Sequence, residues 1–139
     1  MIKDKLNAMP YIGGHTGFVA NFETMTNKDI DVYLAYLLGE INADQLINGV
    51  TVTRYTESET EAYKLIHENS IAIIPIKENG YRAAKMEFND SEEMEYVSGY
   101  KSCSENDLVP IVSGLKTLCR VLEIEELEKA INLFETLQK

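Results

Sequence analysis

The order of its periodic segments constrains the fold of this chain more than any other feature. Apolar residues recur at helical spacing in some stretches and alternate with polar residues in others, which predicts helices and strands respectively. The predicted elements, in chain order, are a helix at 27–38, a strand at 50–55, a helix at 58–68, strands at 71–76, 81–88 and 94–101, a helix that Ser104 and Asp107 begin and that ends near Leu122, and a last helix at 123–138. Strands in one cluster with helices on either side predict an α+β sandwich.

Local signals support several of these boundaries. Thr26 or Asn27 can cap the first helix, and Asp29 lies in its first turn, where negative charge suits the helix dipole. Asn79-Gly80 is typical of a tight hairpin turn between two strands. Pro75 places its strand at a sheet edge or at a bulge, because proline cannot donate a ladder hydrogen bond.

A length of 139 residues predicts one domain with a core of its own. We expect an irregular lead-in at 1–25 that can hold a short strand at 18–22, a sandwich core at 27–122 and a C-terminal helix at 123–139. Within this single-domain sandwich, an antiparallel sheet of about four strands packs between helices. The last helix either completes the core or forms a homodimer interface.

Composition narrows the classes of function. The net charge of −10 argues against direct binding to nucleic-acid backbones, which requires a basic face. It allows an acidic surface that docks onto a basic patch of another protein, or it serves solubility. The longest apolar runs are too short for a membrane span, and the mixed charge at Met1–Lys5 predicts no signal peptide. We therefore expect a cytosolic protein that is not bound to membranes.

The chain has only two histidines and two cysteines, the residue types that many catalytic sites require. Cys103 and Cys119 have no CxxC spacing, so with His15 and His67 they predict free thiols and no zinc site. His15 lies in the turn 13–17, which is either a simple loop or a nest of N–H groups for an anion. No GxSxG or HExxH motif occurs. We expect no cofactor, no metal and no catalysis, and a small hydrolase is the least favoured function.

Cations stand beside aromatic residues in three of the predicted strands, and these pairs are the candidate ligand contacts. Neighbours in a strand point to opposite faces, so the cations hold an anion only if they share one face. A tyrosine would then stack on a base, and the alternative is core tyrosines with solvated cations. The candidate ligand-binding residues are Arg54, Tyr55, Tyr81, Arg82, Tyr100, Lys101 and His15.

The densest run of charge is the connection between two predicted strands. Its acids repel one another unless they are solvated or paired with a partner. It is either a solvated loop or a surface that docks onto a basic protein. The candidate partner-binding residues are Glu87, Asp90, Glu92, Glu93 and Glu95.

Three segments together resemble the phage ABA sandwich domain family, small phage and prophage proteins whose sheet lies between helices. They are KDIDVYLAYLLGE, TRYTESETEAYKLI and SENDLVPIVSGLKTLCRVL, which span about 27–122. The resemblance implies a fold and a phage origin, and it carries over no catalytic residues. The expected function is a non-catalytic phage or prophage accessory protein that binds a host protein, for example to inhibit a host defence system. The alternative is a protein that binds or sequesters a small anionic ligand such as a nucleotide signal.

Overall fold

The computed structural model describes residues 2–8, 18–76, 79–88, 91, 94–96 and 103–137. Its helices are α1 (Asn27–Leu37), α2 (Ala43–Asn48), α3 (Glu59–Glu68) and α4 (Pro110–Leu137), with short 3₁₀ turns η1 (Ile2–Lys5), η2 (Phe22–Thr24) and η3 (Tyr55–Glu57). Its strands are β1 (Leu6–Ala8), β2 (Phe18–Ala20), β3 (Ile71–Pro75), β4 (Tyr81–Phe88), β5 (Met94–Tyr96) and β6 (Ser104–Asp107).

Strand β4 organises the larger sheet. It pairs antiparallel with β3 along one edge, and along the other edge with β6 at its start and β5 at its end. Strands β1 and β2 form a separate antiparallel pair. The predicted class is confirmed, because the chain is an α+β protein of one domain with an antiparallel sheet of four strands.

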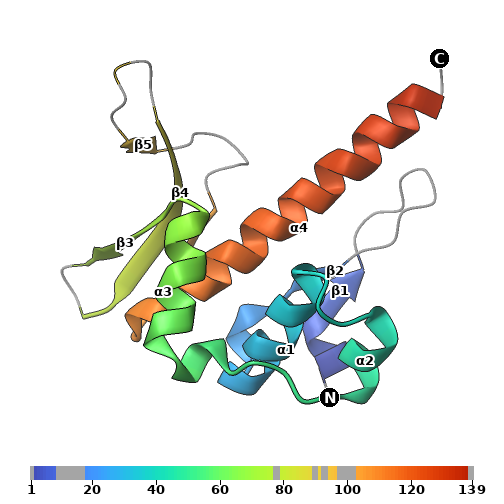
Figure 1. Ribbon diagram of the computed structural model, residues 1–139, viewed down its shortest axis with the longest axis horizontal. Helices are drawn as coiled ribbons and strands as arrows, with labels where there is room; N and C mark the ends of the chain where they lie inside the picture. Colours follow the sequence, from blue (N-terminus) through green and yellow to red (C-terminus); the bar gives the residue numbers. More distant parts are fainter. Residues whose placement is uncertain are drawn as a thin grey trace.

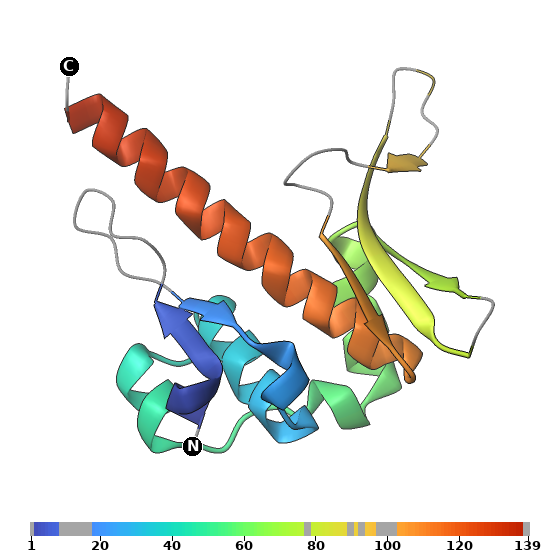
Figure 2. The ribbon, with the colours of Figure 1, turned by 180° about the vertical axis from the view of Figure 1, so that it is seen from behind.

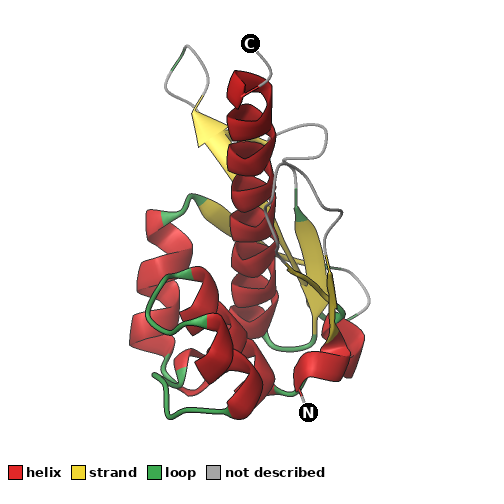
Figure 3. Cartoon of the chain, turned by 90° about the vertical axis from the view of Figure 1, so that its right-hand side faces the viewer, coloured by secondary structure: helices red, strands yellow, loops and turns green. Residues whose placement is uncertain are grey.

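Helix α4 lies in the middle of the molecule. The four-stranded sheet packs against one side of it, and α1 with the β1–β2 pair lies on the other side (Figures 1 and 3). Figure 2 shows the β1–β2 pair from behind, beside the same helix. The largest fully buried side chains come mainly from the two helices in contact, and they include Tyr33, Ile30 and Leu34 of α1 and Leu115 and Leu118 of α4. The core is therefore built around α4.

Gly114 marks the closest packing against α4. A Cβ atom built at this glycine would lie 2.6 Å from Cδ1 of Ile66 and 3.2 Å from Cδ1 of Ile73. Helix α3 and strand β3 therefore meet α4 at one point. The two helices that pack against the sheet, α3 and α4, therefore lie together on one of its faces, whereas the prediction placed the sheet between helices.

The local signals at the helix starts are confirmed. Thr26 and Asp29 form a reciprocal capping box at the start of α1. Ser58 caps α3, whose predicted range differs from the observed one by one residue. Strands β3 and β4 also lie where alternation placed them. These elements are specified locally, which is why sequence patterns located them.

Three predictions are wrong in the described residues. The segment 50–54 is extended but pairs with no strand, and Tyr55 begins the turn η3. Ser104–Asp107 forms strand β6 and does not begin a helix. The last two predicted helices are one, because no glycine or proline interrupts the chain between Leu122 and Glu125. The lead-in is more regular than expected, because β2 lies within the short strand foreseen at 18–22 and β1 pairs with it.

No helix in the described part of the chain has both the length and the apolar character needed to cross a bilayer.

Candidate functional site

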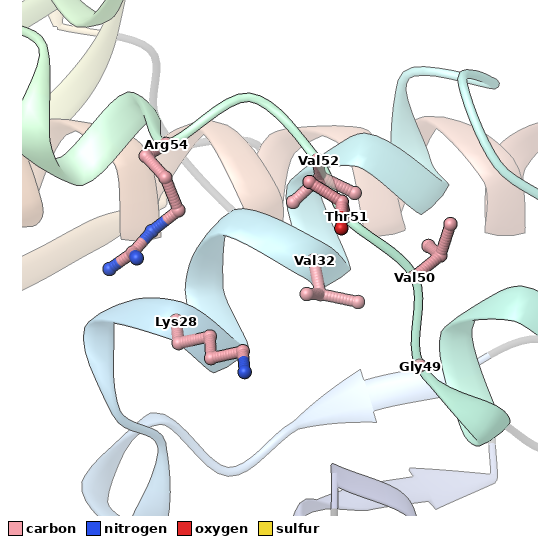
Figure 4. Close-up of a pocket in the computed structure, with 7 residues that line it drawn as sticks. All are labelled: Lys28, Val32, Gly49, Val50, Thr51, Val52 and Arg54. Carbon is pink, nitrogen blue, oxygen red and sulfur yellow. The ribbon is translucent and has the colours of Figure 1, made fainter.

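The candidate site is a groove where an extended segment crosses helix α1. The segment runs from Gly49 to Arg54, and Figure 4 shows it passing over Val32 of α1. The cavity has a volume of about 520 Å³, within the usual range of ligand pockets. We call it the α1 groove, and its lining residues are Lys28, Val32, Gly49, Val50, Thr51, Val52 and Arg54.

The segment is fixed at both of its ends. At its start, Gly49 has a φ of 95°, which a glycine adopts without strain, and its N–H donates to the carbonyl of Gln45 at the end of α2. At its other end, the main chain of Thr56 donates to Asp31 of α1. The groove is therefore preformed, because both ends of the segment are hydrogen-bonded to helices.

Asp31 carries most of this attachment. Its carboxylate is completely buried and accepts hydrogen bonds from the N–H of Thr56, the hydroxyl of Thr56 and Nε of Arg54, each at 2.8 Å. A buried carboxylate requires such partners, because an unpaired one would lose its hydration without compensation. Asp31 therefore holds the segment and orients Arg54 at the same time.

Between these anchors the main chain of the segment is unpaired. Across the described structure, no hydrogen bond reaches a main-chain N–H or C=O of Val50, Thr51, Val52 or Thr53. The side chains still alternate as in a strand, with Val50 and Val52 half-buried and Thr51 and Thr53 exposed. Val52 packs against the core, so the extended conformation is maintained by side-chain burial.

Cations gather at one end of the groove. In Figure 4, Lys28 and Arg54 lie toward one end, while Gly49 and Val50 lie toward the other. The ammonium of Lys28 is exposed and has no hydrogen bond or ion pair to any described residue. Its place in the first turn of α1 is mildly unfavourable for a positive charge, because the helix dipole is positive there. Helix stability therefore does not account for this lysine.

Arg54 is partly neutralised by its neighbours. It pairs with Asp31 and, at 3.0 Å, with Glu57, while its side chain remains 41% exposed. The hydrogen bond to Asp31 raises the pKa of Arg54 above its usual value. Arg54 therefore stays cationic and fixed in position, and Lys28 supplies a charge that no described residue pairs with.

A second, smaller hollow lies along the same segment. It has a volume of about 230 Å³ and is lined by Ala35, Glu40, Ile41, Thr51, Val52 and Thr53. Tyr55 donates a hydrogen bond from its hydroxyl to Glu40 beside it. Burial and this carboxylate raise the pKa of Tyr55 to about 12. Because Thr51 and Val52 line both hollows, the segment has open space along more than one of its sides.

The structure does not assemble the predicted ligand contacts into one site. Arg54 lies beside α1, whereas Tyr81 and Arg82 belong to β4, where Nε of Arg82 donates to the hydroxyl of Ser104. Tyr55 is buried, so its ring does not offer a face for stacking. The predicted contacts Tyr100, Lys101 and His15 lie outside the described residues.

Most of the predicted partner-binding residues also lie outside the described part of the chain. Glu87 is exposed on β4. Glu95 belongs to β5, but its side chain is not among the described ones. Asp90, Glu92 and Glu93 are not described either. The docking hypothesis for this hairpin therefore stays a prediction.

A second cluster of polar groups is structural. Glu123 is 3% exposed and accepts hydrogen bonds from the hydroxyl of Tyr33, the N–H of Ala20 and Nη1 of Arg120. Burial raises the pKa of Glu123, and the bonds from Tyr33 and Arg120 oppose this shift. Both carboxylate oxygens are occupied by protein donors. The cluster therefore joins α1, α4 and β2 and leaves no group free for a ligand.

The described residues offer no cluster of histidine, cysteine and acidic side chains that could hold a metal ion. Cys103 and Cys119 carry thiols that are not joined in a disulfide, as predicted. Burial raises the pKa of Cys103 to about 11, and that of the fully buried Cys119 is raised as well. Both shifts disfavour the thiolate, which is the reactive form of cysteine.

Sequence patterns identified Arg54 but missed the rest of the α1 groove. Lys28 carried one usable signal, a cation in the first turn of a well-capped helix. Val32 carried none, because a valine at a helical position is typical of any buried stripe.

The comparisons with known proteins add no relative, since no protein-family model, curated protein or solved structure matches this chain. The resemblance to the phage ABA sandwich domain family therefore stays a prediction.

Proposed function

We propose that this chain is a non-catalytic binding protein that holds the anionic group of its ligand at the cationic end of the α1 groove. The observation that carries the proposal is Lys28, a cation that has no ion pair among the described residues and lies beside a preformed cavity in a chain of net charge −10. Arg54 lies at the same end, and its side chain is 41% exposed. The apolar side chains of Val32, Val50 and Val52 would contact the uncharged part of the ligand.

A thermal-shift panel tests this function. The panel contains inorganic phosphate, nucleotides including cyclic dinucleotides, and small carboxylates. A ligand that binds only the folded state at 100 times its Kd adds roughly 2.7 kcal/mol to the free energy of unfolding, which raises Tm by several degrees. We expect at least one anion of the panel to do so.

Matched lysine variants locate the effect. Lys28→Met removes the groove cation, and Lys64→Met removes an exposed lysine of α3 that likewise has no partner among the described residues. The shift should disappear in Lys28→Met and persist in Lys64→Met. Equal losses in the two variants, or no shift with any anion, would contradict the proposal. Arg54 is a poorer target, because its removal leaves the buried Asp31 without its cation.

A second candidate function rests on the net charge of −10, which suits docking onto a basic patch of another protein. In this proposal, suggested by the phage resemblance, the chain is a cytosolic phage or prophage accessory protein that inhibits a host defence protein. Replacing Glu87, Asp90, Glu92, Glu93 and Glu95 with their amides tests it by pulldown from host lysate. A stoichiometric partner that is lost in the amide variant and at high salt supports docking, and recovery of no partner contradicts it.

A further inference from the structure

We infer that the ligand of the α1 groove is an extended peptide that bears a carboxylate and pairs its main chain with Val50–Thr53. This inference rests on the proposed function, because it names the class of ligand for the same groove. It starts from the mismatch between sequence and structure in this segment. The Val-Thr-Val-Thr sequence has strong strand propensity, yet its N–H and C=O groups have no hydrogen-bond partner across the described structure.

The segment has the properties of a sheet edge prepared for another strand. Its side chains alternate between half-buried and exposed, and Val52 packs against the core, so the segment is already ordered before a partner arrives. An exposed edge of this kind is the recognition element in strand-addition complexes, where main-chain hydrogen bonds supply affinity. A small anion would leave most N–H and C=O groups of this segment without a hydrogen-bond partner, whereas an added strand would pair with them.

Space and length agree with a short peptide. The segment borders cavities of about 520 and 230 Å³, so an added strand has room beside it. Four residues of strand span about 13 Å at roughly 3.3 Å per residue, which corresponds to a ligand of about four to six residues. Alternate side chains of such a peptide would contact Val32 and Val52.

The position of the two cations predicts where along its length the peptide carries a negative charge. Lys28 and Arg54 lie at one end, and the opposite end at Gly49 and Val50 carries no charge. A carboxylate, from an acidic side chain or a free C-terminus, complements these cations and fixes the register of the added strand. The main chain of Val50–Thr53, which has no partner among the described residues, favours a peptide over a simple anion. Lys28, which has no ion pair among them, favours a peptide with a carboxylate over an apolar peptide.

The test uses the full-length protein and a library of hexapeptides, randomised at every position and made with free and with amidated C-termini. Bound peptides are identified by mass spectrometry after size-exclusion chromatography. Amide hydrogen exchange of the protein is then measured with the best binder. We expect binders to carry a carboxylate near one end and the amides of Val50–Thr53 to exchange at least about tenfold more slowly in the complex, as newly formed hydrogen bonds require.

The same peptide is compared in Lys28→Met and in the control Lys64→Met. Losing one charge-assisted contact should weaken binding about tenfold in the first variant and leave the second unchanged. If small anions stabilise the protein through Lys28 but no library peptide slows exchange at Val50–Thr53, the peptide inference is overturned and the anion-binding function stands. If neither anions nor peptides bind, both fail.

Discussion

Asp31 and Arg54 form an ion pair of 2.8 Å in which the carboxylate is fully buried and the guanidinium remains open to solvent. The pair joins the middle of α1 to the end of the segment 49–54, and Thr56 completes it through its N–H and hydroxyl. The same contact therefore supports the fold and positions a cation at the α1 groove.

The first prediction concerns this contact. Asp31→Ala leaves the buried N–H and hydroxyl of Thr56 without an acceptor, so it should lower the free energy of unfolding by about 2–4 kcal/mol. Glu57→Gln alters the exposed partner of Arg54 and should change it by less than about 0.5 kcal/mol. Urea denaturation measures both. Similar values for the two variants would show that Asp31 does not anchor the segment.

The second prediction is a pH dependence that arises from Asp29. Burial pushes the pKa of Asp29 upward, but hydrogen bonds from Lys5 and Thr26 outweigh it and hold the pKa below the ordinary value of 3.8. A depressed pKa means that the unfolded chain binds the proton more tightly, so the stabilisation is present above pH 3.8 and is lost as the pH falls below it.

Asp29→Asn should therefore lower the free energy of unfolding by about 1 kcal/mol at pH 7. The difference from the native protein should shrink as the pH falls from 4 to 2. Glu23→Gln is the control, because Glu23 is exposed and has no ion pair among the described residues. A constant difference for Asp29→Asn across this range would refute the assignment.

The third prediction concerns the contact between α3 and α4. Alanine favours a helix over glycine by about 1 kcal/mol, but at Gly114 the added methyl group would clash with Ile66, which is buried. Overpacking of this kind typically costs about 1–3 kcal/mol, so Gly114→Ala should destabilise the protein.

A double-mutant cycle with Ile66→Val tests the cause. Valine lacks the Cδ1 atom that would lie 2.6 Å from the added methyl carbon, so the cost of Gly114→Ala should fall in that background. Thermal unfolding of the four proteins gives the interaction free energy. Strict additivity of the two substitutions would mean that α3 and α4 do not meet at this glycine.

The fourth prediction distinguishes one long helix from two. Glu125 is exposed and lies inside α4, where proline removes a hydrogen bond and clashes with the preceding turn. Glu125→Pro should therefore cost about 3 kcal/mol or more relative to Glu125→Ala. In two helices that divide near residue 123, the same proline would fall in a first turn and be tolerated. Circular dichroism during urea unfolding measures the difference.

Sequence patterns predicted the elements that local signals specify. The capping box of Thr26 and Asp29, the Ser58 cap and the alternation of β3 and β4 all act within a few residues. They were sufficient for the class of fold and for the boundaries of α1 and α3.

The remaining features depend on contacts distant in sequence. Ser104–Asp107 becomes a strand because β4 offers it a pairing edge, which overrides a cap-like sequence. Val50–Thr53 has the composition of a strand, but it pairs with no described strand, because Asp31 holds the following residues against α1. The α1 groove was missed for the same reason, since its walls come from segments more than ten residues apart that only the fold brings together.

The most direct test of the central claim is an NMR titration of the ¹⁵N-labelled protein with inorganic phosphate. If the anion binds at Lys28, we expect the chemical-shift changes to centre on Lys28, Val32 and the segment 49–54, and we expect Lys28→Met to abolish them. Changes of equal size around the exposed Lys64, or changes confined to the sheet around Arg82, would contradict an anion site in the α1 groove.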